Sequence, residues 1–105
     1  MTDGLIELKD SNFSEKTKKG EWIIDFWAAW CGPCRMMSPE FAAAAKESKK
    51  INFGKLDVDS NSETASKFEV MSIPTLIFIK NGKEVGRTVG LVGKDAINAK
   101  AKEFL

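Results

Sequence analysis

The two cysteines of this chain are spaced so that they can close a disulfide and open it again. Cys31 and Cys34 are the only cysteines in 105 residues. In the chain-entropy account, closing a loop of four residues stabilises a fold by only about 2 kcal/mol, against about 3 kcal/mol for a loop of fifteen. Redox chemistry therefore explains this pair better than stability does, and the spacing predicts a site that alternates between dithiol and disulfide.

The composition narrows the chemistry of the pair. The chain has no histidine, which removes the usual general base, metal ligand and pH switch. The two cysteines could supply half of the ligands of a zinc site, but a complete site needs two further cysteines or histidines, and the sequence has none. We therefore prefer a redox pair to a zinc site or an inert staple. We expect the two sulfurs to hold the electrons, with no metal and no organic cofactor.

The bulk properties are those of an ordinary globular protein, and we expect residues 1–105 to form a single domain. Hydrophobic residues make up 43% of the chain, charged residues 30%, and the formal net charge is +1. Because the charges are interleaved, we expect neither nucleic acid nor a membrane as a partner, and we expect a monomer.

The chain also lacks the sequence features of a membrane or exported protein. Its apolar runs stay well short of the roughly 18 residues that a membrane span requires. Met1 to Gly4 is not a basic segment followed by an apolar run, so we expect no secretory signal. A CxxC pair without such a signal fits a reducing compartment, which predicts a cytoplasmic protein.

The hydrophobic pattern places the cysteines between a strand and a helix. Trp22 to Ala29 is apolar on both faces except at Asp25, which is typical of a central strand covered on two sides. After Cys31 the pattern becomes helical, and we expect a helix to about Lys50, kinked at Pro39. The stripe of this helix expected to face the core holds Cys34, Met37, Phe41 and Ala44.

The remaining strands predict a mixed sheet in an α/β fold. Besides residues 22–29, the expected strands are residues 5–8, 51–58, 75–80 and 83–89. Asn81-Gly82 predicts a tight hairpin turn between the last two strands, and Gly86 marks a bulge. The order β-α-β-α-β-α-β-β-α predicts five strands, parallel in the first half and antiparallel in the last, with helices on both faces.

The remaining helices are shorter. Asp10 or Ser11 can cap a helix that carries Phe13 and stops at Gly20. Residues 61–63 can open a short helix that ends near Phe68. A final helix is expected over residues 94–105, and the side chains expected to face inward are Ile97, Ala101 and Phe104.

The strand–helix junction gives the two cysteines different roles. Cys31, as the capping residue, faces the free N–H groups and the positive end of the helix dipole, which favours the thiolate and lowers its pKa. Cys34 lies one turn further in and is more buried. We therefore assign Cys31 as the exposed attacking nucleophile and Cys34 as the resolving thiol. Pro33 suits and stiffens the first turn, while Gly32 lets a partner's backbone approach the sulfur.

The run from Trp30 to Cys34 resembles the active-site motif of the thioredoxin family in full. The resemblance continues over most of the chain at Asp25-Phe26-Trp27-Ala28, Pro39, Ile73-Pro74-Thr75, Asn81-Gly82 and Gly90. It implies the thioredoxin fold and a protein-disulfide reductase, or dithiol electron carrier, acting by thiol–disulfide exchange. It also implies that thioredoxin reductase recharges the protein and that disulfide-containing proteins are its substrates.

Two other functions remain open beside this one. Disulfide isomerases and oxidants of the same fold carry a histidine between their cysteines, whereas Gly32-Pro33 resembles the reducing branch. A disulfide oxidase or isomerase therefore stays as the first alternative. A binding subunit that uses the same fold without redox chemistry is the second.

The resemblance implies a role in proton transfer for two polar residues. In thioredoxins the residue that matches Asp25 lies beneath the disulfide and assists proton transfer at the buried cysteine, and Lys55 resembles the lysine paired with it. The alternatives are an acid that sees water and an ordinary surface lysine.

The resemblance also implies a substrate groove. Pro74 is expected to follow a cis peptide bond, which places its ring against the sulfurs and leaves the Ile73 backbone free to pair with an extended substrate. Trp30 is expected to line the groove, with Gly90 and Leu91 on its other wall. The alternative is that Trp30 belongs to the core.

Overall fold

The computed structural model describes residues 4–105, so the expectation of no leader at the N-terminus, and the first three residues of the expected domain, lie outside the described residues. The strands are β1 (Leu5–Leu8), β2 (Glu21–Trp27), β3 (Asn52–Asp57), β4 (Thr75–Lys80) and β5 (Lys83–Val89). The helices are α1 (Phe13–Thr17), α2 (Gly32–Glu47), α3 (Ser62–Lys67) and α4 (Lys94–Phe104). The predicted order of strands and helices is confirmed.

The five strands form one mixed sheet in the order β1-β3-β2-β4-β5. β3 runs parallel to both β1 and β2, whereas β4 runs antiparallel to β2 and β5 runs antiparallel to β4. The sheet is therefore parallel in its first half and antiparallel in its last, as the element order predicts. In the centre, Asp25 of β2 pairs with Lys55 of β3 on one side and with Leu76 of β4 on the other.

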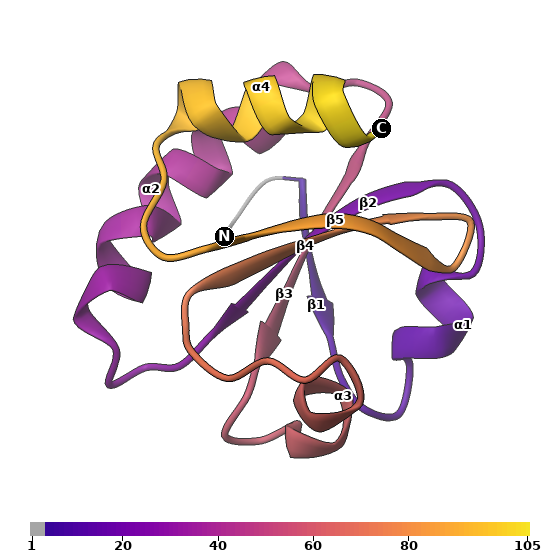
Figure 1. Cartoon of the computed structure of the whole chain (residues 1–105), viewed down its shortest axis with the longest axis vertical. Helices are drawn as coiled ribbons and strands as arrows, with labels where there is room; N and C mark the ends of the chain where they lie inside the picture. The colour runs from indigo at the N-terminus through magenta and orange to yellow at the C-terminus, as the bar shows by residue number, and fades with distance from the viewer. Residues whose placement is uncertain (1–3) are drawn as a thin grey trace.

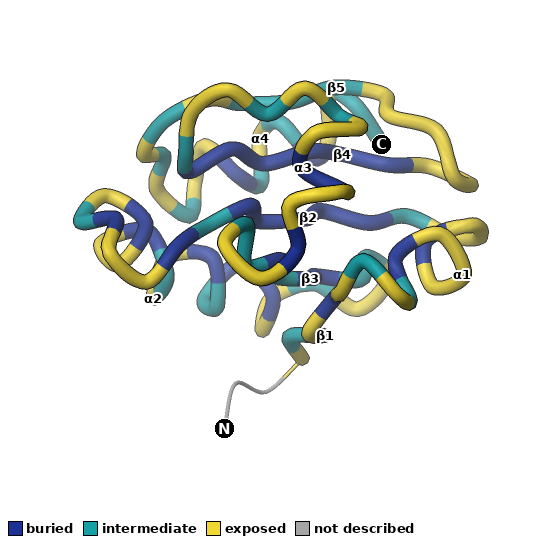
Figure 2. Tube along the Cα trace, turned by 90° about the horizontal axis from the view of Figure 1, so that it is seen from below, coloured by how far each residue is buried: buried dark blue, intermediate teal, exposed yellow. Residues whose placement is uncertain are grey.

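Helices cover both faces of this sheet, with α2 and α4 on one face and α1 and α3 on the other (Figure 1). Successive residues of β2 alternate between the two cores: Ile23 packs with Phe41 of α2, and Ile24 packs with Phe13 of α1. β2 and β4 are almost wholly buried and β3 mixes buried with half-buried residues, while the loops and helix surfaces around them are largely exposed (Figure 2). Asp25 shares the face of Ile23, so it lies on the α2 side.

The predicted cap of α1 is wrong. The helix begins after Asn12, and neither Asp10 nor Ser11 caps it. The Asp10 carboxylate instead accepts hydrogen bonds from the backbone N–H of Glu63 and from both the N–H and the hydroxyl of Thr64. Asp10 therefore caps α3, a helix more than 50 residues away in the sequence.

Both of the first two helices end three residues earlier than expected. α1 ends at Thr17, with Gly20 following in a left-handed conformation (φ 86°). α2 ends at Glu47 because Ser48 is already extended, and its hydroxyl accepts a hydrogen bond from the N–H of Ile51. Pro39 lies inside α2, and the helix continues through it.

The predicted bulge at Gly86 is confirmed and serves helix packing. Phe78 of β4 pairs with Gly86, but the next residue, Ile79, pairs with Glu84, so β5 has one extra residue. A Cβ atom at position 86 would overlap the ring of Phe104 in α4. The glycine therefore allows α4 to dock closely over the edge of the sheet.

We expect Gly86→Ala to lower the free energy of unfolding by about 1–3 kcal/mol, because the added methyl group must displace a packed aromatic ring. Urea unfolding followed by circular dichroism measures this. Gly32→Ala is the control, since a Cβ atom there meets nothing within 4 Å. Equal effects of the two substitutions would contradict the packing role of Gly86.

Candidate active site

The turn from β2 into α2 places both cysteines at one helix start. Cys31 is the N-cap of α2, with an extended backbone (φ −86°, ψ 112°), and its sulfur accepts a hydrogen bond of 3.2 Å from the N–H of Cys34. The two residues form a disulfide, with their Cα atoms 5.2 Å apart. Pro33 occupies the first turn of the helix, as the sequence predicts.

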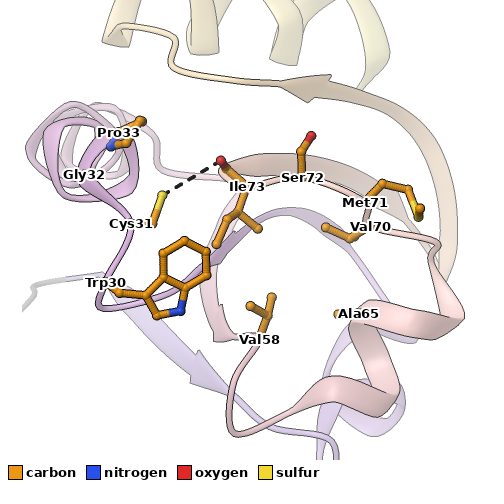
Figure 3. A pocket seen from close by; sticks show the side chains of 10 residues that line it. All are labelled: Trp30, Cys31, Gly32, Pro33, Val58, Ala65, Val70, Met71, Ser72 and Ile73. Carbon is orange, nitrogen blue, oxygen red and sulfur yellow. Dashed lines mark hydrogen bonds between the residues drawn. The ribbon is translucent and has the colours of Figure 1, made fainter.

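Two further contacts fix this turn. Arg35, one residue beyond Cys34, donates a hydrogen bond of 2.8 Å to the carbonyl oxygen of Ala29 and so spans the redox loop. The sulfur of Cys31 lies 3.9 Å from the carbonyl oxygen of Ile73, a contact drawn as a dashed line in Figure 3. The loop before β4 therefore lies directly beside the disulfide.

That loop contains the cis peptide bond expected from the resemblance. The Ile73–Pro74 bond is cis, and Pro74 is buried. The carbonyl oxygen of Pro74 accepts a hydrogen bond of 2.8 Å from the N–H of Gly90, which lies just beyond β5 with a φ of 99°. Gly90 and the exposed Leu91 thus lie next to Pro74 in the structure.

A groove of about 490 Å³ opens at the disulfide, on the side toward α3 (Figure 3). Trp30, Cys31 and Ile73 bound it at one end, and Met71 bounds it at the other. Its complete lining is Trp30, Cys31, Gly32, Pro33, Val58, Ala65, Val70, Met71, Ser72 and Ile73. Pro74, Gly90 and Leu91 are not part of this lining.

Trp30 is exposed and does not belong to the core, with 67% of its surface accessible. Its indole N–H donates a hydrogen bond of 2.9 Å to the carboxylate of Asp59, which follows β3. Met71, across the groove, is 92% exposed. The groove thus has large, accessible apolar side chains on two of its sides, although nothing within residues 4–105 covers them.

Sequence reasoning did not assign Asp59 to the site, nor five of the groove residues, namely Val58, Ala65, Val70, Met71 and Ser72. Val58 ends the strand expected over residues 51–58, and Ala65 lies in the short helix expected before Phe68, so the sequence did place both on elements. Their proximity to Cys31 cannot be read from the sequence, however, because it depends on how α3 packs beside the carboxyl end of β2. The sequence alone shows only ordinary apolar positions there.

Asp25 is completely buried, and neither of its carboxylate oxygens has a hydrogen-bond partner among the described residues. This burial raises the pKa of Asp25 to about 7, and the positive charge of Lys55 partly opposes the rise. The alternative of an acid that sees water is therefore wrong. The carboxyl group can hold a proton near neutral pH and release it, as a general acid or base must.

Lys55 pairs in register with Asp25 but does not form an ion pair with it. Its ammonium lies 4.7 Å from the centre of the Trp27 ring and 3.3 Å from the hydroxyl oxygen of Ser38 in α2. No ion pair within 4 Å joins Lys55 to any acid in the part of the chain that the structure describes. Lys55 is half-buried, so part of its stem packs against the fold.

Residues 4–105 contain no group of three or more potential ligands of the histidine, cysteine, aspartate or glutamate type close enough to hold a metal ion. Over the same residues, every helix is too short or too polar to cross a membrane.

Comparison with known proteins connects this geometry to a family. A family model described as Thioredoxin matches residues 4–103. The chain is 48% identical over 92 residues to thioredoxins of Staphylococcus saprophyticus and Staphylococcus haemolyticus, and 45% identical to a thioredoxin of Staphylococcus aureus. Each match covers 87% of this chain and 88% of the relative.

The burial of Asp25 predicts a pH-dependent effect of Asp25→Asn on stability. The folded protein holds the Asp25 proton up to about pH 7, whereas the unfolded chain releases it near pH 4. Stability therefore falls as the pH rises through this interval and stays low above it. We expect Asp25→Asn to raise the free energy of unfolding by up to about 4 kcal/mol at pH 8 and to change it little at pH 4.

Urea unfolding of the oxidised proteins at the two pH values measures this difference. The exposed Asp95 supplies the control, and Asp95→Asn should change the free energy of unfolding by less than about 1 kcal/mol at either pH. If Asp25→Asn raises the free energy of unfolding by the same amount at pH 4 and at pH 8, Asp25 ionises normally and the prediction is wrong.

Proposed function

This chain belongs to the thioredoxin family of protein-disulfide oxidoreductases, and we propose that it works as a protein-disulfide reductase. The family and the paired cysteines make it a dithiol redox carrier. The observation that carries the proposal is the Cys31–Cys34 disulfide, seated at the start of α2 and opening onto an apolar groove. Such a site can accept a substrate disulfide and exchange electrons with it.

The proposed reaction is two successive thiol–disulfide exchanges. The Cys31 thiolate attacks one sulfur of a substrate disulfide, forms a mixed disulfide, and releases the other substrate sulfur as a thiolate that takes up a proton. Cys34 then loses its proton and attacks Cys31, which closes the Cys31–Cys34 disulfide and releases the second substrate thiol. The substrate gains two electrons and two protons, and the carrier is oxidised.

The surroundings of the two sulfurs support this division of roles. Cys31 lines the groove and has an N–H group directed at its sulfur, an arrangement that stabilises a thiolate. Cys34 does not line the groove and lies on the buried stripe of α2 with Met37 and Phe41. Only 4% of Cys31 and 2% of Cys34 are exposed, so the expectation of an exposed Cys31 is wrong for the disulfide form. The position of Cys31 on the groove is what supports the proposal that an incoming disulfide meets this sulfur first.

We assign proton handling to Asp25 and Lys55. Asp25 is the buried acid of β2, on the face of the sheet that α2 covers, and its pKa near 7 suits it to take the proton that Cys34 must lose. In the part of the chain that the structure describes, Lys55 is the one charged group whose field acts appreciably on Asp25. In this proposal Lys55 sets how readily the carboxyl group ionises.

We assign substrate binding to the groove and to the loop beside it. Ile73 lies outside β4, so its backbone is available to pair with an extended segment of substrate. Trp30 supplies an exposed aromatic wall, and Gly32 and Pro33 leave room near the sulfur. Pro74, joined to Gly90 by a backbone hydrogen bond, and the exposed Leu91 lie outside the groove lining, and we assign all three to a second binding wall beside it.

The proposed cycle requires partners on both sides. Disulfide-containing proteins oxidise the carrier, and thioredoxin reductase returns the pair to the dithiol. We further propose that the protein acts as a monomer of one domain in the cytoplasm, where thiols are kept reduced. The cysteine pair holds the electrons, so the proposed reaction uses neither a metal nor an organic cofactor.

Reduction of insulin disulfides in the presence of dithiothreitol tests the function. We expect the wild-type protein to accelerate insulin precipitation, and Cys31→Ser to abolish this acceleration because the nucleophile is gone. Cys34→Ser should instead accumulate mixed disulfides with its substrates, since the resolving step is lost. Retention of wild-type activity by Cys31→Ser would overturn the proposed mechanism.

A measurement of the redox potential separates a reductase from an oxidase or isomerase. We expect equilibration with glutathione to give a potential below the cytosolic glutathione poise, because no histidine lies between the cysteines to stabilise the dithiol. A potential well above that poise would favour the oxidase or isomerase, with each 30 mV corresponding to about 1.4 kcal/mol for this two-electron couple.

A further inference from the structure

The side chain of Lys55 is held by α2, although its strand neighbour is a buried acid. The Lys55 ammonium donates a hydrogen bond of 3.3 Å to the Ser38 hydroxyl and lies over the Trp27 ring. Asp25 occupies the paired position on β2, yet within residues 4–105 its oxygens accept no hydrogen bond, and its carboxylate lies more than 4 Å from the Lys55 ammonium. The most obvious partner of the buried carboxyl group is thus directed elsewhere.

The neighbouring elements offer few other charged or polar groups that could stabilise the Asp25 carboxylate in place of Lys55. Leu76, the neighbour of Asp25 on β4, is apolar. On α2, the side chains that face the sheet are apolar apart from the cysteine, and Arg35 is directed to the Ala29 carbonyl. Glu7 on β1 and Asp57 at the end of β3 lie beside Lys55 and Trp27 in the sheet, and neither reaches Lys55 within 4 Å. Among the described residues, Lys55 is therefore the one cation whose charge acts on Asp25.

We propose that Ser38 is a positioning residue whose hydroxyl holds the Lys55 ammonium away from Asp25, so that the buried carboxyl group stays without a partner. The inference deepens the proposed function and rests on it, because an unpaired carboxyl group matters only if Asp25 handles the proton of the resolving cysteine. Ser38 does not touch the reacting sulfurs. It acts through Lys55.

The physical effect follows from the competition for one ammonium group. A direct Lys55–Asp25 ion pair would favour the ionised carboxylate and lower the pH at which Asp25 gives up its proton. A hydrogen bond to the Ser38 hydroxyl satisfies one of the three ammonium donors outside the buried site. The carboxyl group then remains poised to exchange a proton near neutral pH, where a general acid–base group is most effective.

The titration of the Asp25 carboxyl carbon by ¹³C NMR tests this in the oxidised protein. We expect Ser38→Ala to move the midpoint down by about half a pH unit or more, as loss of a hydrogen bond to a charged group allows. Ser38→Thr keeps the hydroxyl and is the matched control, with a midpoint close to that of the wild type. Alanine is a strong helix former, so Ser38→Ala should fold.

A double substitution shows whether the effect passes through Lys55. We expect Ser38→Ala to produce no further shift in a Lys55→Met protein, because the ammonium that Ser38 positions is absent. An unchanged midpoint in Ser38→Ala, or an equal shift with and without Lys55, would overturn the inference. A shift in Ser38→Thr as large as that in Ser38→Ala would also overturn it.

The same proteins in the insulin assay separate this inference from the proposed function. If the wild type reduces insulin but Ser38→Ala leaves the Asp25 titration unchanged, only the role of Ser38 fails. If the wild type does not reduce insulin, the proposed function fails, whereas the titration still decides whether Ser38 positions Lys55. With both correct, the lower limb of the pH–rate profile of Ser38→Ala should move down with the Asp25 midpoint.

Discussion

The start of α2 at Cys31 is the constraint on which the redox site depends. A helix leaves the N–H groups of its first turn without partners inside the helix, and the sulfur of Cys31 accepts one of them. Three residues on, the helix period brings Cys34 to the same side, with its Cα atom 5.2 Å away, within the usual range for a disulfide. The apolar stripe of α2 then fixes which cysteine faces the core.

The central position of β2 imposes a second constraint. Because β3 and β4 flank it and helices cover both faces, a side chain at Asp25 has no route to solvent. A carboxyl group there lowers stability at neutral pH, since burial penalises its charged form and, among the described residues, no hydrogen-bond donor reaches it. A residue retained at such a cost is more simply explained by proton chemistry than by folding.

The sequence was sufficient for the elements because each has a strong local signal. The apolar run of β2, the helical spacing from Cys34 to Ala44 and the turn at Asn81-Gly82 all appear where they were predicted. The predictions that are wrong concern contacts between residues far apart in the sequence. Asp10 has the right side chain for a cap, but the free N–H groups that it satisfies belong to α3, and no local pattern distinguishes these from the N–H groups of α1.

The same distinction between local signals and long-range contacts applies to the residues of the site. The cysteines, Asp25 and the cis bond before Pro74 could be anticipated because a motif or an interrupted strand marks them. The groove could not be delimited from the sequence, since its far wall comes from Ala65 and Val70, around α3. Likewise, a serine at position 38 of a predicted helix carries no sign that a lysine from β3 reaches it.

Under the proposed function, this arrangement separates substrate recognition from proton transfer. The groove lies on the side of the disulfide toward α3, whereas Asp25, Lys55 and Ser38 lie on the side of the sheet that α2 covers. The disulfide stands between the two. On this proposal, changes in groove residues such as Met71 alter which proteins bind without disturbing the ionisation of Asp25, and changes in Ser38 do the reverse. Such a division would allow one redox mechanism to serve many substrate surfaces.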